Sequence, residues 1–152
     1  MADLTTTVTE SVVLNGALRG NTNTVTNTGI NNVFERIVTC AHSVETTIAV
    51  FATDPSTPSG STAIDVNNVK YIRVTNLDAD GTVQLAIVGT STGYIVNLPP
   101  NTSHILNGAE AVFKGRASTT PAFGALENLA ALTVKPEGTA YTPQVAIFVA
   151  GV

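Results

Sequence analysis

Short runs of β-branched and other apolar residues recur from Val33 to the end of the chain, and turn-forming residues separate them. Val, Ile and Thr favour strands, whereas Gly, Pro, Asn and Asp favour turns. Strands that recur at intervals of about 8–12 residues are typical of a sandwich or barrel. With the polar N-terminal segment we expect about nine strands in an all-β antiparallel β-sandwich of two sheets. The runs are VFERIVTCAHSV, TTIAVFAT, NVKYIRVTNL, GTVQLAIVG, GYIVNL, SHILNG, AVFKGRAS and QVAIFVAGV.

The last of these runs, QVAIFVAGV, is apolar at both alternating sets of positions. A strand buried on both faces has this pattern. We therefore expect the last strand to lie centrally in a sheet and to pair with a strand far away in the sequence, as in a jelly roll. Tyr71, Phe113 and Phe148 lie in runs of this apolar kind, and we expect them in the core.

One segment has the spacing of a helix rather than of a strand. In FGALENLAALTV, Leu126, Leu129 and Leu132 are separated by three residues, and Ala fills the gaps. Leucines at this spacing share one face of a helix, and Ala favours helical backbone. The segment therefore predicts a helix of about two turns.

The chain changes character near residue 31. Residues 1–31 include TTTVTES and RGNTNTVTNTG, in which Thr alternates with Val or Asn and large apolar side chains are scarce. Such a segment cannot bury enough apolar surface to form a core by itself. We expect residues 1–31 to form either an extended arm docked on a neighbouring subunit or a pair of edge strands, and residues 32–152 to form one β-sandwich domain.

The low charge of the chain limits its partners. Charged residues are 12% of the 152 residues, against about 25% in an average soluble domain. The net charge is −4, and the seven Lys and Arg form no cluster. A nucleic-acid binder needs a clustered positive surface, so we expect no nucleic-acid partner. No signal peptide and no run of about 20 apolar residues is present, so we expect no membrane partner and folding in a cytoplasm.

The hexad Asn76-Leu77-Asp78-Ala79-Asp80-Gly81 has the spacing of the first half of a calcium-binding loop. The twelfth position of that loop needs a bidentate acid, but it is Ile87 here. Asp-Gly between two alternating runs is also a strong hairpin signal. The sequence favours a hairpin turn at Asp80-Gly81 without a metal, although Asp78 and Asp80 could still hold a weakly bound surface cation.

No other residue set predicts a metal centre, a cofactor site or a catalytic site. Cys40-x-His42 offers two zinc ligands at most, and His104 has no ligand at a suitable spacing. We expect a small buried Cys40 and packed or surface histidines. No nucleophile motif, paired-carboxylate motif or phosphate-binding loop is present, so we expect no enzyme unless Asp54 or Glu45 converges on His104 in space.

Sugar-binding β-sandwiches present exposed aromatic side chains, above all Trp, as stacking platforms. This chain has no Trp. Tyr94 and Tyr141 are the candidates for an exposed platform, which keeps a carbohydrate-binding adhesion module as an alternative.

Residues 68–118 and the last strand carry a resemblance to a known class of proteins. NVKYIRVTNLDADGTVQLAIV, then YIVNLPPNTSHILNG and AVFKGRAS, resemble a pattern of tailed-phage virion proteins. In that pattern a strand of the type YIRITNLD leads into a VxL strand, and a later strand ends in L-x-Pro-Gly. Pro99-Pro100-Asn101 replaces the usual Pro-Gly here, and the first third of the chain does not match.

The resemblance implies a jelly-roll capsid decoration or cement protein without cofactor or chemistry. It implies a virion protein on the capsid surface, made in the host cytoplasm, with the major capsid protein as partner. It also implies a symmetric homo-oligomer, often a trimer. A tail, collar or fibre-base component of the virion remains the alternative that the sequence does not separate.

Overall fold

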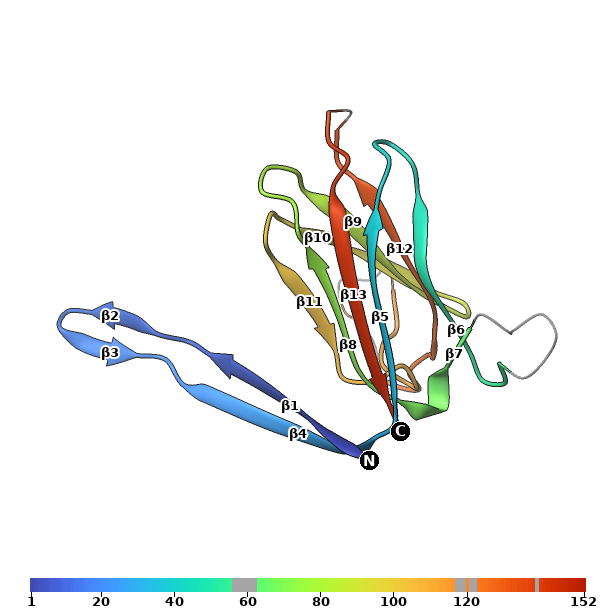
Figure 1. The fold of residues 1–152 in the computed structure, drawn as a ribbon, viewed down its shortest axis with the longest axis horizontal. Coiled ribbons are helices and arrows are strands. Elements are labelled where there is room, and N and C mark those ends of the chain that lie inside the picture. The colour runs from blue at the N-terminus through green and yellow to red at the C-terminus, as the bar shows by residue number, and fades with distance from the viewer. Residues whose placement is uncertain (56–62, 117–119, 121–122, 139) are drawn as a thin grey trace.

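A computed structural model describes residues 1–55, 63–116, 120, 123–138 and 140–152 of the chain. Two β-sheets pack against each other, and a long two-stranded ribbon projects from one end of them (Figure 1). The described residues form thirteen strands rather than about nine, because the N-terminal segment alone contributes four of them. The ribbon consists of β1 (Ala2–Thr9), β2 (Val12–Leu14), β3 (Ala17–Arg19) and β4 (Thr22–Ile30).

The body follows with nine strands and one short 3₁₀ helix, η1 (Val66–Asn68). Its strands are β5 (Asn32–Thr39), β6 (Thr46–Ala52), β7 (Ile64–Asp65), β8 (Val69–Asn76), β9 (Val83–Gly89), β10 (Gly93–Leu98), β11 (Ser103–Leu106), β12 (Leu129–Pro136) and β13 (Gln144–Gly151). The four-stranded sheet has the order β11-β8-β13-β5, and the five-stranded sheet has the order β10-β9-β12-β6-β7.

This strand order is that of a jelly roll. Apart from the two-residue β7, the first strand of the body pairs with the last, the second with the second to last, and so on. The pairs are β5 with β13, β6 with β12, β8 with β11, and β9 with β10. A long antiparallel hairpin rolled into two sheets gives these pairs. The prediction of an all-β, jelly-roll-like sandwich is confirmed.

The core lies between the two sheets, because alternate residues of each strand point inwards. β13 lies between β8 and β5, as its two apolar faces predict. Phe113 is buried in this core as predicted. Tyr71 is buried in a separate cluster with Ile30 and Ala150, against which the half-buried Phe148 packs, so the prediction of positions in this core for Tyr71 and Phe148 is wrong. The largest fully buried side chains come from both sheets and include Ile48, Ile72, Leu85, Ile87, Leu129, Leu132 and Ile147.

The predicted helix over FGALENLAALTV is wrong. Leu129–Pro136 form β12, which lies between β9 and β6. The pairing of β12 with β9 shifts by one residue between Leu129 and Ala131, which is a β-bulge. Because a bulge adds one residue to the strand, Leu129 and Leu132 both face the core despite their spacing of three.

AVFKGRAS is also not the strand that the sequence predicts. The described part, Ala111 to Arg116, forms one isolated bridge between Phe113 and Glu127, and the remaining two residues lie outside the described part of the chain. Phe113 is nevertheless buried, and its ring lies 5.3 Å from that of Tyr94. Its apolar side chain therefore fills the core from a loop rather than from a sheet.

The predicted Asp80-Gly81 hairpin is wrong as well, because β8 and β9 belong to different sheets. A two-residue hairpin of type I′ requires positive φ at both central residues. Neither Asp80 nor Gly81 has a positive φ. A Cβ on Gly81 would lie 3.1 Å from the Tyr141 side chain, so glycine allows this close packing. The segment is a corner at which the chain crosses from one sheet to the other.

Asn76 organises this corner. Its side chain is fully buried, and its amide nitrogen donates hydrogen bonds to the carbonyls of Gly81 (2.7 Å) and Leu98 (2.9 Å). Its amide oxygen accepts a bond from the backbone N–H of Asp78 at 3.0 Å. The backbone N–H of Asn76 donates to the carbonyl of Thr102. One side chain therefore joins the β8–β9 corner to the end of β10.

We expect Asn76→Ala to lower the free energy of unfolding by about 3 kcal/mol, because it leaves two carbonyls and one N–H without partners in a buried site. Urea unfolding monitored by circular dichroism measures this loss. Asn97→Ala, at an exposed position on β10, is the matched control and should have little effect. Equal losses in the two variants would contradict the role of Asn76.

Candidate functional site

The N-terminal ribbon is exposed along most of its length. β1 pairs with β4, and β2 with β3, so the ribbon is a hairpin that belongs to neither sheet of the body. In Figure 1 it points away from the sandwich (blue), and most of it touches no other element. An isolated two-stranded hairpin is at best marginally stable in water. We call residues 1–30 the arm and residues 12–19 the hairpin tip.

The two faces of the arm differ. One face is a ladder of threonines, in which Thr7 and Thr24 share a hydrogen bond of 3.2 Å, and Thr9 and Thr22 one of 3.3 Å. These pairs are exposed. The opposite face includes the half-buried Leu4 and turns toward the body. The alternation of Thr with Val or Leu in the sequence therefore produces one hydroxyl face and one mixed face.

A β-bulge sets the direction in which the arm leaves the body. Between Ala2 and Leu4 the pairing with β4 skips one residue, and Gly29 has a φ of +77°. A glycine in the left-handed region is typical of a bulge that bends a strand. One residue further, Ile30 is buried against Tyr71 and Ala150. The root of the arm is therefore fixed to the four-stranded sheet.

The hairpin tip closes with the turn that the sequence analysis overlooked. Asn15 and Gly16 have φ of 52° and 75°, and Leu14 pairs with Ala17 across them. Asn-Gly between two apolar runs is the strongest short hairpin signal, so it was available in the sequence. Positive φ at both central residues, which Asp80 and Gly81 lack, makes Asn15-Gly16 a two-residue hairpin turn.

The tip exposes apolar side chains. Val13 is 70% exposed and its cross-strand partner Leu18 is 72% exposed, while Val12 and Leu14 are exposed on the opposite face. Arg19 is the one charged residue of the tip. Below the tip, a Cβ on Gly20 would overlap the carbonyl of Glu10, so the chains approach closely there. The tip has the composition of a contact surface rather than of a solvated loop.

A groove of about 410 Å³ lies between the arm and the outer face of the four-stranded sheet. Phe148 lies in its floor, and the Arg73 guanidinium stands 5.8 Å from the centre of that ring. We call this space the arm groove. It is lined by residues 4–8 on the arm and by Glu35, Tyr71, Arg73, Ser103, Ile105 and Phe148 on the sheet.

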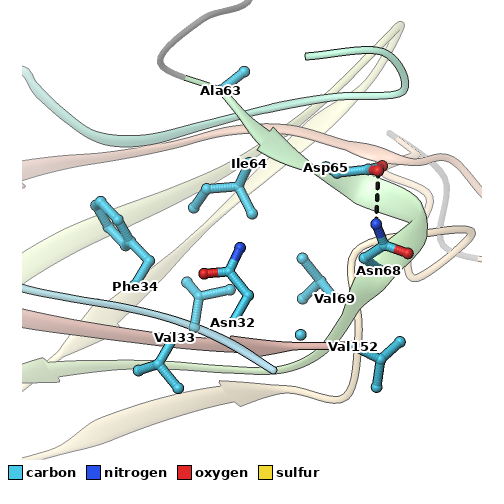
Figure 2. A pocket seen from close by; sticks show the side chains of 11 residues that line it. Asn32, Val33, Phe34, Ala63, Ile64, Asp65, Asn68, Val69 and Val152 are labelled. Carbon is cyan, nitrogen blue, oxygen red and sulfur yellow. Dashed lines mark hydrogen bonds between the residues drawn. The ribbon is translucent and has the colours of Figure 1, made fainter. Parts of the chain in front are cut away.

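A second pocket, of about 260 Å³, lies where the arm joins the body (Figure 2). Phe34, Ile64 and Val69 give it an apolar floor, and Asn32 reaches toward its centre. The Asp65 carboxylate accepts a 2.8 Å bond from Asn68 and a 3.0 Å bond from the backbone of Asn67. Asp65 is therefore engaged in capping η1, and the lining offers no arrangement of acid, base and nucleophile.

The outer face of the five-stranded sheet is also partly apolar. Val50, Val88 and Ile95 are exposed there. Lys135 and Glu45 lie on the same face with 3.9 Å between Nζ and Oε1, and both are exposed. Exposed pairs of this kind contribute little to stability. Both outer faces of the sandwich thus combine few charges with uncovered aliphatic side chains.

The oxygens of the predicted calcium loop are used by the backbone. Oδ1 of Asp78 accepts bonds from the N–H groups of Asp80 (2.8 Å) and Gly81 (3.0 Å), and these bonds lower the pKa of Asp78. The oxygen of Asn76 is engaged within the same corner. Ile87, at the twelfth position, is fully buried in the core. The arrangement is that of a hydrogen-bonded turn.

The remaining candidate residues do not converge. Cys40 is fully buried as predicted, and burial raises the pKa of its thiol, whereas His42 is exposed in the following turn. Glu45 pairs with Lys135 on the outer face of the five-stranded sheet, while His104 belongs to β11 of the other sheet. Over the described residues, no three His, Cys, Asp or Glu side chains gather as metal ligands.

The two candidate stacking tyrosines are engaged in packing. Tyr94 is half-buried and stacks edge-to-face with Phe113, and burial raises the pKa of its hydroxyl. Tyr141 is 41% exposed, but its side chain lies on Gly81. They lie on different elements and form no common platform.

Glu127 is a polar residue that the sequence analysis did not single out. Its carboxylate accepts bonds from the backbone N–H groups of Ser91 (2.9 Å) and Thr92 (3.0 Å) and from the Thr92 hydroxyl (2.9 Å). These bonds lower the pKa of Glu127. Its role is to hold the β9–β10 turn against the segment before β12.

Comparison of the chain with protein-family models, with curated proteins and with solved structures gives no match. Among the described residues, no helix reaches the length and hydropathy that a membrane span requires. The candidate site therefore rests on the geometry of the arm, the arm groove and the two outer faces.

His104 predicts a pH dependence of stability. It faces inwards from β11, its Nε2 is buried with no hydrogen-bond partner in the described part of the chain, and burial lowers its pKa below 6.5. The unfolded chain therefore binds a proton more readily, so stability is complete above about pH 6.5 and falls as the pH drops toward the folded pKa. Urea unfolding at about pH 7.5 and about pH 5.5 measures the difference.

His104→Gln should reduce this pH dependence, because other titrating groups are the same in both proteins. His42→Gln, at an exposed position, is the control and should retain it. An identical slope of stability against pH in wild type and His104→Gln would show that His104 is not its source.

Proposed function

We propose that this chain is a structural protein of a phage particle that decorates and cements the capsid by bridging neighbouring subunits. The observation that carries the proposal is the arm: a two-stranded hairpin outside both sheets, with a tip whose apolar side chains no described residue covers. A hairpin of this kind gains stability when it packs against another surface. The resemblance of residues 68–118 to virion proteins supports the same role.

The proposed mechanism is mechanical. The jelly-roll body supplies a stiff unit, and its low-charge outer faces and its arm supply contacts to the major capsid protein and to other copies. Interface cores are depleted in charge, as these surfaces are. Each contact can be weak, because symmetry repeats it over the shell and linked contacts strengthen each other. No cofactor and no catalytic step belong to this function.

Shortening the arm should weaken attachment to capsids without unfolding the body. Replacing residues 10–21 by Asn-Gly joins Thr9 to Thr22, which are already paired, and retains the buried root at Ile30. We expect the melting temperature to remain close to that of wild type and the number of copies bound per capsid to fall. Quantitative gel analysis of purified particles measures occupancy.

Val44→Asp supplies a matched control for Leu18→Asp, because both replace an exposed aliphatic side chain by a carboxylate and only Leu18 lies on the tip. Leu18→Asp should lower occupancy and Val44→Asp should not. Unchanged occupancy after arm shortening would overturn the role of the arm. Copy number also separates the two virion locations: hundreds of copies indicate the capsid, and about a dozen or fewer indicate a tail, collar or fibre base.

A further inference from the structure

Within one copy, the described residues leave both the hairpin tip and the arm groove uncovered. On the face that holds Arg19, the tip carries Val12 and Leu14 at 56% and 58% exposure. The groove exposes Ile105 and the half-buried Phe148 beside the arm. The tip lies at the far end of the arm from the groove, which the arm root lines, so a tip does not reach the groove of its own chain (Figure 1).

The charges of the tip and of the groove complement each other. Arg19 is the single charged side chain of the tip, and it has no ion pair within the described part of the chain. Glu35 lines the groove and likewise has no ion pair among the described residues. The other charged lining residue, Arg73, is positioned over Phe148. An unpaired carboxylate beside an apolar floor suits a tip with one cation and aliphatic side chains.

The arrangement also allows the contact to be reciprocal. The groove lies along residues 4–8, near the root of the arm, and the tip lies at residues 12–19. Two antiparallel arms that meet near residue 10 therefore place each tip against the root of the other. An interface in which residue i contacts residue j, and j contacts i, closes by symmetry.

We infer that the hairpin tip of one copy binds in the arm groove of a second copy, so that the arms are exchanged between copies. The inference rests on the proposed function, in which the arm connects subunits, and names a second copy of this chain as the partner of the tip. Val12 or Leu14 packs toward Phe148 and Ile105, and Arg19, which lies on the same face of the tip, pairs with Glu35.

Cysteine cross-linking tests the contact in the full-length protein. A protein with Leu14→Cys is mixed with a protein with Ile105→Cys, and in parallel with a protein with Val50→Cys on the outer face of the other sheet. Cys40 does not compete, because it is fully buried. The tip–groove heterodimer should form about tenfold faster than the control heterodimer, because bound partners have a raised effective concentration. Equal rates would overturn the inference.

Charge reversal tests the pairing of Arg19 with Glu35. Arg19→Glu and Glu35→Arg should each weaken self-association about fivefold in sedimentation equilibrium, and the double variant should regain it. Lys70→Glu, exposed and outside the groove, is the control. If the loss of self-association free energy in the double variant equals the sum of the losses in the two single variants, Arg19 and Glu35 do not contact each other.

The outcomes separate this inference from the proposed function. If the wild type stays monomeric and gives no tip–groove cross-link, while arm shortening still lowers capsid occupancy, the tip binds the capsid protein and the arm exchange is wrong. If the cross-link forms but arm shortening leaves the number of copies bound per capsid unchanged, the arm exchange is confirmed and the proposed role of the arm in cementing the capsid is wrong.

Discussion

The hydrogen bonds of the buried Asn76 side chain hold together the place where the jelly roll changes sheets. Two donated bonds and one accepted bond connect the β8–β9 corner with the end of β10. A jelly roll needs such corners because successive strands alternate between two sheets, and the backbone that crosses the edge of the core loses its ladder partners. A single primary amide is well suited to this position, since it can donate twice and accept at its oxygen.

The body and the arm differ in how far their apolar side chains are buried. In the body, both sheets contribute fully buried aliphatic side chains to one core, and Asn76 is the one buried polar side chain among the described residues. The arm has two strands and no second layer, so its apolar positions at the tip stay uncovered. Such asymmetry within one small chain is typical of proteins whose exposed segment is completed by a partner.

The sequence predicts the fold class well because successive side chains of a strand point to opposite faces, so alternating apolar residues mark the face that is buried. Prediction from the sequence fails where one local pattern is compatible with two different structures. Leu129 and Leu132 have a helical spacing, but a bulge produces the same spacing in a strand. Asp80-Gly81 carries a hairpin signal, yet β8 and β9 belong to different sheets and Gly81 packs closely against Tyr141, which is far away in the sequence. The Asn15-Gly16 turn was readable, whereas the arm groove depends on the angle of the arm and has no local signal.

The join between arm and body is a single residue, Asn31, whose N–H is bonded to the carbonyl of Gly151. The root of the arm is thus attached directly to the four-stranded sheet through Asn31 and the buried Ile30. The bend at Gly29 sets the direction in which the arm leaves the sandwich, and so the direction in which the tip is presented. In an assembly of many copies, a change of a few degrees at this bend would alter the curvature of the whole surface.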